Sequence, residues 1–180
     1  MLFEYIETER LKLRKITPQV MEYVYNTLTD NEIIAFFGLP SIEALEKEKY
    51  KFRNGLSTFN KSYLNFVIID KQTDTAIGNC GYHTWYLDHD RAEIGYALYD
   101  DTHKRKGYMS EAVAAVLTYG FNEMNLYRIE AMAADYNTAS LKILEKFGFI
   151  FEGRLREHYN VNGKMEDSVL YGLLKKEFKG

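Results

Sequence analysis

The chain has 180 residues, with 23 Lys and Arg against 26 Asp and Glu. Its net charge of -3 excludes a strongly basic nucleic-acid-coating protein as the default, although it allows a local basic patch. The single cysteine, Cys80, excludes a disulfide scaffold and a thiolate metal cluster and indicates a reducing compartment such as the cytoplasm. No apolar run approaches the ~20 residues that span a bilayer, and the start of the chain lacks a signal-peptide pattern, so we expect no membrane partner.

Apolar spacing predicts the elements of the first third of the chain. Residues 10–16 alternate between apolar and charged, which predicts a half-exposed strand. Thr17-Pro18 predicts a helix start, with helical spacing through Leu28, and the break at residues 39–41 starts a second helix. We expect the apolar stripe of the second helix to contain Ile42, Leu45, Phe52, Leu56 and Phe59.

Strands dominate the rest of the chain. The expected strands are residues 63–70, which are nearly continuously apolar, 76–86, 91–99, 127–133, a start at 149–151, 155–161 and 164–174. One helix is expected through residues 112–121, and another from Asn137 to Phe147, closed by Gly148. Asn162-Gly163 predicts a tight hairpin between the last two strands.

These elements predict an α/β (α+β) fold with a mixed, mostly antiparallel sheet. Their order is β-α-α-β-β-β-α-β-α-β-β, with one β-α-β crossover between residues 91–99 and 127–133. No composition shift or linker marks a boundary, so we expect residues 1–180 to form a single domain.

The most informative motif is DTHKRKGYMSEA, residues 101–112, between a predicted strand and a predicted helix. Gly107 allows a tight turn, and a helix N-terminus adds about half a positive charge. Lys104, Arg105 and Lys106 add full charges and Ser110 adds a hydroxyl, which together favour a phosphate cradle. A solvated basic turn is the alternative. Neither a P-loop nor a dinucleotide-binding motif is present.

A second motif starts the next helix at Asn137-Thr138-Ala139-Ser140. By itself it is an ordinary helix start, with Asn137 as the N-cap. The histidines and the cysteine show no pattern typical of a functional site. His83, His89, His103 and His158 lack metal-ligand spacing, so no metal is expected, and Cys80 in an apolar strand favours core packing.

Four blocks in order resemble the GNAT acyltransferase superfamily, which uses acyl-coenzyme A. The blocks are residues 92–96, 107–112, 128–131 and 137–149. The opening residues 9–14 and the closing Glu152-Gly153, Asn162-Gly163, Asp167 and Tyr171 are similar to the RimJ/RimL-like branch, which includes protein N-terminal acetyltransferases. The resemblance covers nearly the whole chain.

The resemblance implies a sheet that splays between the fourth and fifth predicted strands, residues 91–99 and 127–133, with helices on both faces. Coenzyme A would lie in that gap, with its pyrophosphate on the turn around Lys104, Gly107, Tyr108, Met109 and Ser110. Lys104 stands where the family usually has Gln or Arg. Met109 is larger than the family's usual residue, so its side chain must point away from the phosphates.

The pantetheine arm would pair with the backbone of Tyr96, Ala97 and Leu98 and would also bind Asn137. Ser140 would lie near the sulfur and could protonate the leaving thiolate, with Tyr136 as an alternative acid. At pH 7 only about one alkylamine in a thousand is neutral, so acylation of an amine requires a base. Glu93, on the strand facing the gap, is the leading candidate, although it could be an ordinary surface carboxylate.

Further residues are candidates for the acceptor side. Glu157 and Tyr159, near the final hairpin, are alternative bases or acceptor-binding groups. Phe36 and Phe37, with Asp30 and Glu32 close by, could border the acceptor groove, although a solvated loop explains the acids equally well.

The expected function is direct acetyl transfer from acetyl-CoA to a primary amine in a ternary complex, with no covalent cysteine intermediate. A protein N-terminal α-amine is one acceptor; a polyamine or an aminoglycoside-type amine is the alternative. A non-catalytic coenzyme A-binding module is the rival from another class. Nucleic acid is not an expected partner, and the abundant aromatic residues leave a homodimer open.

Overall fold

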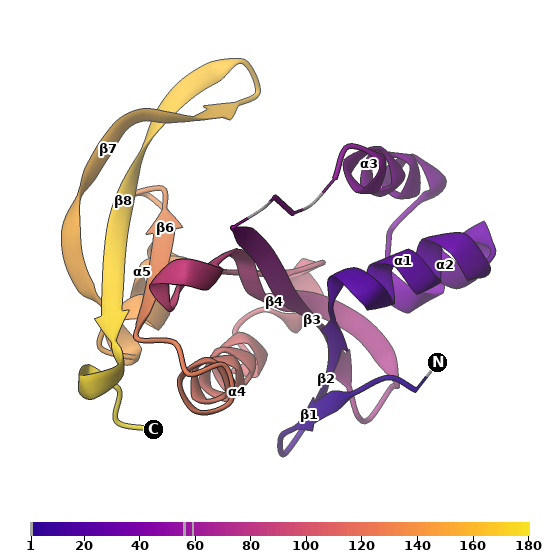
Figure 1. Ribbon diagram of the computed structural model, residues 1–180, viewed down its shortest axis with the longest axis horizontal. Helices are drawn as coiled ribbons and strands as arrows, with labels where there is room; N and C mark the ends of the chain where they lie inside the picture. The colour runs from indigo at the N-terminus through magenta and orange to yellow at the C-terminus, as the bar shows by residue number, and fades with distance from the viewer. Residues whose placement is uncertain (1, 56, 59) are drawn as a thin grey trace.

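One eight-stranded sheet organises the chain, in the order β1-β2-β3-β4-β5-β6-β8-β7 (Figure 1). The computed structural model describes residues 2–55, 57–58 and 60–180. Its strands are β1 Tyr5–Glu7, β2 Leu11–Ile16, β3 Lys61–Asp70, β4 Thr75–Tyr86, β5 Arg91–Leu98, β6 Arg128–Ala133, β7 Ile150–Val161 and β8 Lys164–Leu174. Neighbouring strands run antiparallel except β5 and β6, which are parallel, so the predicted mixed sheet is confirmed.

Helices cover both faces of the sheet, as predicted. The helices are α1 Pro18–Thr27, α2 Asp30–Phe37, α3 Ile42–Arg53, α4 Tyr108–Asn122 and α5 Thr138–Lys146 (Figure 1). The first three share one hydrophobic core and the last two share another. Strand β3 separates the two cores, because Phe66 and Ile68 point toward α4 while Val67 and Ile69 point toward α1–α3.

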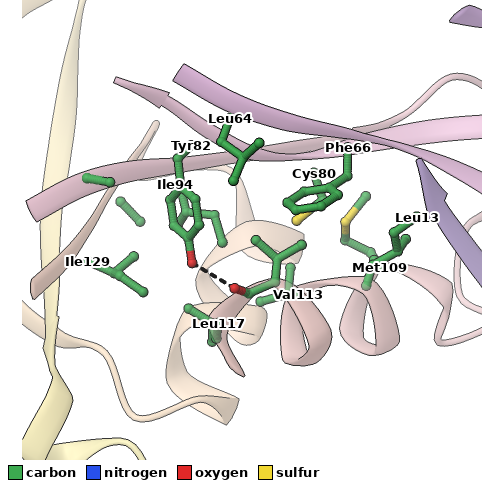
Figure 2. Packing of buried hydrophobic residues seen from close by; sticks show 14 of the residues in the cluster. Leu13, Leu64, Phe66, Cys80, Tyr82, Ile94, Met109, Val113, Leu117 and Ile129 are labelled. Carbon is green, nitrogen blue, oxygen red and sulfur yellow. Dashed lines mark hydrogen bonds between the residues drawn. The ribbon is translucent and has the colours of Figure 1, made fainter. Parts of the chain in front are cut away.

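A buried tyrosine fixes α4 beneath β4. The hydroxyl of Tyr82 donates a hydrogen bond to the carbonyl of Val116, 2.8 Å away, inside the larger core (Figure 2). The helix approaches the ring closely at Gly120, where an added Cβ would lie 2.1 Å from the Tyr82 hydroxyl. Since α4 begins at the basic turn, this contact also fixes that turn relative to β4 and β5.

Every predicted element is present, and the local signals act as expected. Thr17 caps α1, and Ser41 caps α3. Asn162 and Gly163 both have positive φ, 53° and 86°, as a two-residue hairpin turn requires. Strand β7 is continuous rather than two pieces, because bulges after Phe151 and after Leu155 let it follow β8 along its whole length.

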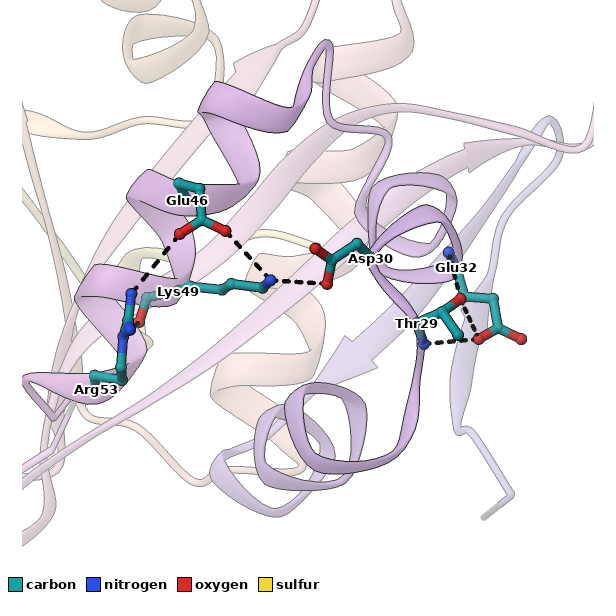
Figure 3. Close-up of polar contacts among 6 residues, drawn as sticks. All are labelled: Thr29, Asp30, Glu32, Glu46, Lys49 and Arg53. Carbon is teal, nitrogen blue, oxygen red and sulfur yellow. Dashed lines mark hydrogen bonds and ion pairs between the residues drawn. The ribbon is translucent and has the colours of Figure 1, made fainter.

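Besides three short 3-10 helices, the described residues add one strand and one α-helix that were not predicted, β1 and α2. Helix α2 starts with a capping box in which Thr29 and Glu32 bind each other reciprocally (Figure 3). Lys49 of α3 pairs with Asp30 at 2.7 Å and ties the two helices together (Figure 3). The interpretation of this segment as a solvated loop is therefore wrong.

The predicted stripe of α3 is only partly right. Leu45 is fully buried and Phe52 packs against the second core, but Ile42 begins the helix and is 46% exposed. Leu56 and Phe59 lie outside the described residues. Within the described part of the chain, no helix is both long and apolar enough to cross a membrane.

Candidate active site

The sheet splays open between β5 and β6, as predicted. The two strands pair at only three positions among the described residues, from Arg91 opposite Arg128 to Glu93 opposite Glu130. Beyond Glu93, β5 continues to Leu98 on the edge of β4, while β6 follows β8 instead. The edge of β5 that faces the gap therefore presents backbone N–H and C=O groups with no strand partner.

A cavity of about 290 Å³ occupies this wedge, and we call it the wedge cavity. Its lining includes five residues that were predicted to serve the site: Glu93, Tyr96, Asn137, Ser140 and Tyr159. They come from β5, α5 and β7, which are distant in sequence. The divergence of β5 and β6 thus brings the predicted groups together around one space.

Two hydroxyl groups meet across the wedge cavity. The Tyr96 hydroxyl lies 2.9 Å from Ser140 Oγ, which joins β5 to the first turn of α5. Burial raises the pKa of the Tyr96 phenol and outweighs the opposite effect of the Ser140 hydrogen bond, so the phenol stays protonated at neutral pH. The side-chain oxygen of Asn137 accepts a hydrogen bond from the backbone N–H of Ser140 at 3.2 Å. The NH2 group of the same side chain can donate to a ligand.

A carboxylate–imidazole pair also lines the wedge cavity. Glu93 is 12% exposed, and its Oε1 lies 3.1 Å from His83 Nε2. His83 stands at a bulge of β4, where the register with β5 shifts between Tyr82 and Thr84. Its ring lies directly over Gly95, where an added Cβ would be 2.7 Å from Nδ1, so a glycine here makes room for the imidazole.

His83 was considered in the sequence only as a metal ligand, and its place beside Glu93 was missed. The bulge that turns its ring over β5 depends on the pairing of two strands, which no local pattern reveals. Within the described residues, no group of three His, Cys, Asp or Glu side chains could hold a metal ion.

Of the two candidate residues in the final hairpin, Tyr159 lines the wedge cavity and Glu157 does not. Tyr159 lines the wedge cavity, where burial and the nearby negative charge of Glu93 raise the pKa of its phenol. Glu157 is exposed, has a positive φ of 48° in a bulge of β7, and donates its backbone N–H to Asp167. The bulge places it with Arg154 and Asp167 around a separate surface depression rather than the wedge.

A second cavity of about 400 Å³ lies between helices α1–α3 and the sheet, and we call it the side cavity. Phe37 lines it, whereas Phe36 is buried in the second core. Asp30 and Glu32 do not reach it, because Lys49 and Thr29 bind them. His83 lines both the side cavity and the wedge cavity, so the two spaces meet at its ring.

The basic turn has the shape expected of an anion cradle. Arg105 and Gly107 both have positive φ, 60° and 82°, and the chain reverses before α4. Gly107 occupies the N-cap without a side-chain hydrogen bond, so the first N–H groups of α4 receive no cap from it. Lys104 and Lys106 are exposed beside it, and Lys104 pairs with Asp101 at 2.5 Å.

The first residues of α4 point in different directions. Met109 is buried between the sheet and α4, which confirms that its side chain points away from the turn (Figure 2). Ser110 is partly exposed. The Tyr108 hydroxyl donates a hydrogen bond to the carboxylate of Asp70 at 3.2 Å and so connects the turn to the end of β3.

Arg10 and Glu111 fasten the turn to the start of β2. The Arg10 guanidinium donates to the carbonyl of Lys106 at 2.9 Å and pairs with Glu111 at 2.7 Å. The Thr8 hydroxyl donates to the same carboxylate at 2.6 Å. Burial raises the pKa of Glu111, but the hydrogen bonds from Thr8 and Arg10 outweigh it and lower the pKa overall.

Comparisons with known proteins agree with this geometry. Residues 10–150 match the model of the acetyltransferase (GNAT) domain. The chain is 34% identical to the uncharacterized N-acetyltransferase YoaA of Bacillus subtilis over 97% of this chain and 98% of that protein. It is 35% identical to the uncharacterized N-acetyltransferase p20 of Bacillus licheniformis over 98% of this chain and 99% of that protein.

A solved structure of a GNAT-family acetyltransferase from Bacillus anthracis superposes with a TM-score of 0.67 at 28% identity, covering 97% of this chain and all of that one. The matched residues 10–150 include β5, β6, α4 and α5, and therefore the basic turn and all the described wedge residues except Tyr159. The chain therefore belongs to the GNAT family of N-acetyltransferases.

Proposed function

We propose that this N-acetyltransferase moves an acetyl group from acetyl-CoA directly to a primary amine while both substrates are bound. The observation that carries the proposal is the wedge cavity, which the His83–Glu93 pair and the Tyr96–Ser140 pair both line. A base and hydroxyl donors around one space are what amine acylation by a thioester requires.

Acetyl-CoA fits the wedge and the turn in complementary ways. The unpaired edge of β5 from Tyr96 to Leu98 offers backbone groups to the amides of the pantetheine arm. Arg105, Lys106 and the free N–H groups that follow Gly107 offer positive charge to a pyrophosphate. The buried Met109 side chain leaves that cradle clear.

The proton of the amine would leave through His83. The Glu93 carboxylate lies beside His83 Nε2, which favours the tautomer that carries its proton on Nε2. In that tautomer Nδ1 is the nitrogen that can accept the proton of the amine. The amine nitrogen attacks the thioester carbonyl, the carbon–sulfur bond breaks, and His83 takes the amine proton while Glu93 stabilises the imidazolium. Ser140, supported by Tyr96, donates a hydrogen bond to the leaving thiolate, which needs little further help because a thiol has a pKa of about 8.5.

Two classes of acceptor are compatible with the fold. Solved structures of this fold include a ribosomal-protein-S5-alanine acetyltransferase from Vibrio fischeri and a spermidine/spermine N-acetyltransferase from Vibrio cholerae. A protein N-terminal α-amine, the acceptor class of the RimJ/RimL-like branch, has a pKa of about 8 and needs less deprotonation than an alkylamine. We propose a cytoplasmic site of action, which suits the unpaired, buried Cys80.

The test is acetyl-CoA binding followed by turnover. Calorimetry should give saturable binding, and a panel of amines should release coenzyme A thiol. Glu93→Gln and Ser140→Ala should lower kcat with little change in acetyl-CoA affinity, whereas Glu123→Gln, an exposed carboxylate at the far end of α4, should change neither. Binding without thiol release from any amine would favour a non-catalytic module, and absence of binding at millimolar acetyl-CoA would refute both.

A further inference from the structure

The side cavity adjoins the wedge and has the size of a small-molecule site. Its volume of about 400 Å³ lies within the usual range of about 300–1,000 Å³ for such sites. Its walls come from helices α1, α2 and α3 and from strands β2, β3 and β4, and His83 lines both this cavity and the wedge cavity. A group held here is therefore adjacent to the base that we assign to the reaction.

The walls of the side cavity are mainly apolar and aromatic. Tyr25 stacks with Phe37, with ring centroids 6.0 Å apart. Ile16 and Val67 are buried lining residues, and Tyr63, also in the lining, is 9% exposed. Such a surface favours an aromatic or branched aliphatic group, because burying that group removes apolar area from water.

The charge in the side cavity is balanced. Glu48 is the lone carboxylate among its described lining residues, and Lys51, also in the lining, pairs with it at 2.5 Å. An ammonium group buried here would lack a carboxylate of its own and would have to compete with Lys51. Since burying an unpaired charge is costly, this cavity disfavours a polycation.

The buried hydroxyl of one lining residue, Tyr25, lacks a partner. Within the described residues, Tyr25 Oη is the single buried side-chain polar atom with no hydrogen bond. Burial, followed by the negative charge of Glu48, raises the pKa of Tyr25 to about 12, so the phenol remains a donor at neutral pH. A buried donor without an acceptor destabilises a fold, and a bound molecule that displaces the covering atoms and brings an acceptor atom to this oxygen would relieve that cost.

We propose that the side cavity binds the uncharged tail of the acceptor, which is a monoamine with an aromatic or branched apolar group that carries a hydrogen-bond acceptor for Tyr25. This inference rests on the proposed function, because a tail in the side cavity leaves the amine at His83 and the thioester in the wedge. It excludes polyamines as preferred substrates. A free arylalkylamine and the apolar first residue of a peptide share this chemistry.

The acceptor panel tests the chemistry directly. We expect kcat/KM to fall in the order 4-methoxyphenethylamine, 2-phenylethylamine, spermidine, with the methoxy compound favoured over the unsubstituted one about threefold to tenfold. Tyr25→Phe should abolish that methoxy preference, because it removes the hydroxyl alone. Tyr23→Phe, on the same helix but outside the cavity lining, is the matched control and should retain the preference. A short peptide beginning with Phe distinguishes the peptide source from the free amine.

A charge variant tests the exclusion of polyamines. Lys51→Gln should free Glu48 and raise the kcat/KM for spermidine at least threefold relative to 2-phenylethylamine, whereas Lys47→Gln, exposed on the same helix, should not. The inference is overturned if spermidine is the better substrate of the unmodified enzyme, or if Tyr25→Phe leaves the methoxy preference intact.

A binding measurement separates this inference from the proposed function. Calorimetry would follow 4-methoxyphenethylamine binding to the full chain saturated with coenzyme A. Binding that weakens in Tyr25→Phe, in a protein that acetylates nothing, would uphold the side cavity while refuting the proposed reaction. Absence of binding would overturn the inference even if other amines are acetylated.

Discussion

The contact between His83 and Gly95 can be used to separate base catalysis from substrate binding. In Gly95→Ala, the new Cβ would lie 2.7 Å from Nδ1, whereas ordinary Cβ contacts begin at 3.4 Å. The imidazole must therefore move by the difference of about 0.7 Å, and a movement directed away from Glu93 stretches their 3.1 Å contact to about 3.8 Å, beyond hydrogen-bonding distance. The side chain of His83 is 52% exposed, so it can move without disrupting the core.

The expected result is a selective loss of turnover. General-base catalysis contributes about 10²–10⁴-fold, and a displaced but present imidazole should lose part of it, so kcat should fall about tenfold to a hundredfold. Steady-state kinetics would measure kcat, and calorimetry would measure acetyl-CoA affinity, which should stay within about twofold because the basic turn is untouched. Gly153→Ala is the matched control, since a Cβ there meets no atom within 4 Å.

A double-mutant cycle gives the refuting result. Once His83→Ala has removed the ring, Gly95→Ala should cost nothing further, so the two effects on kcat should be strongly non-additive. Additive losses, or full kcat in Gly95→Ala, would contradict the assignment of the base to the His83–Glu93 pair.

Three further predictions concern the turn, the core and the cysteine. Gly107→Val should weaken acetyl-CoA binding about tenfold by calorimetry, because its φ of 82° is strained for a β-branched residue; unchanged affinity would contradict the cradle. Because the pKa of Glu111 is lowered in the folded chain, its stabilisation is present above the unfolded value of about 4.5 and is lost as the pH falls through the folded pKa. Glu111→Gln should therefore lower Tm at pH 7, and a difference that persists undiminished near pH 3 would refute this. Burial raises the pKa of Cys80, so a thiol reagent should label it only on unfolding and should leave activity intact, whereas rapid labelling with inactivation would be inconsistent with a buried core thiol.

Local signals were sufficient to predict most of the fold. Thr17-Pro18, Gly148 and Asn162-Gly163 act within one turn of chain, and each has the role that the sequence predicts. Helix α2 was missed although Thr29 and Glu32 have capping-box spacing, because the acidic residues Asp30 and Glu32 were also consistent with a solvated loop. The strand β1 is too short to have a detectable pattern.

Residues of the candidate site that belong to motifs in a fixed order along the chain were predicted. Residues whose place depends on how neighbouring strands pair were missed. Tyr96, Asn137 and Ser140 were predicted from the resemblance to the family, and they line the wedge cavity. His83 reaches Glu93 only because a bulge in β4 shifts the pairing, and a bulge in β7 separates Glu157 from Tyr159. The side cavity forms between helices α1–α3 and the sheet, so its lining reflects packing that no single segment encodes.

A crystal structure with acetyl-CoA would show whether the donor binds in the wedge. We expect the pantetheine arm along the open edge of β5 beyond Glu93, the pyrophosphate against residues 104–110, and the thioester between His83 and Ser140. Density for the donor on another face, or β5 and β6 paired along their full length around an empty wedge, would contradict it.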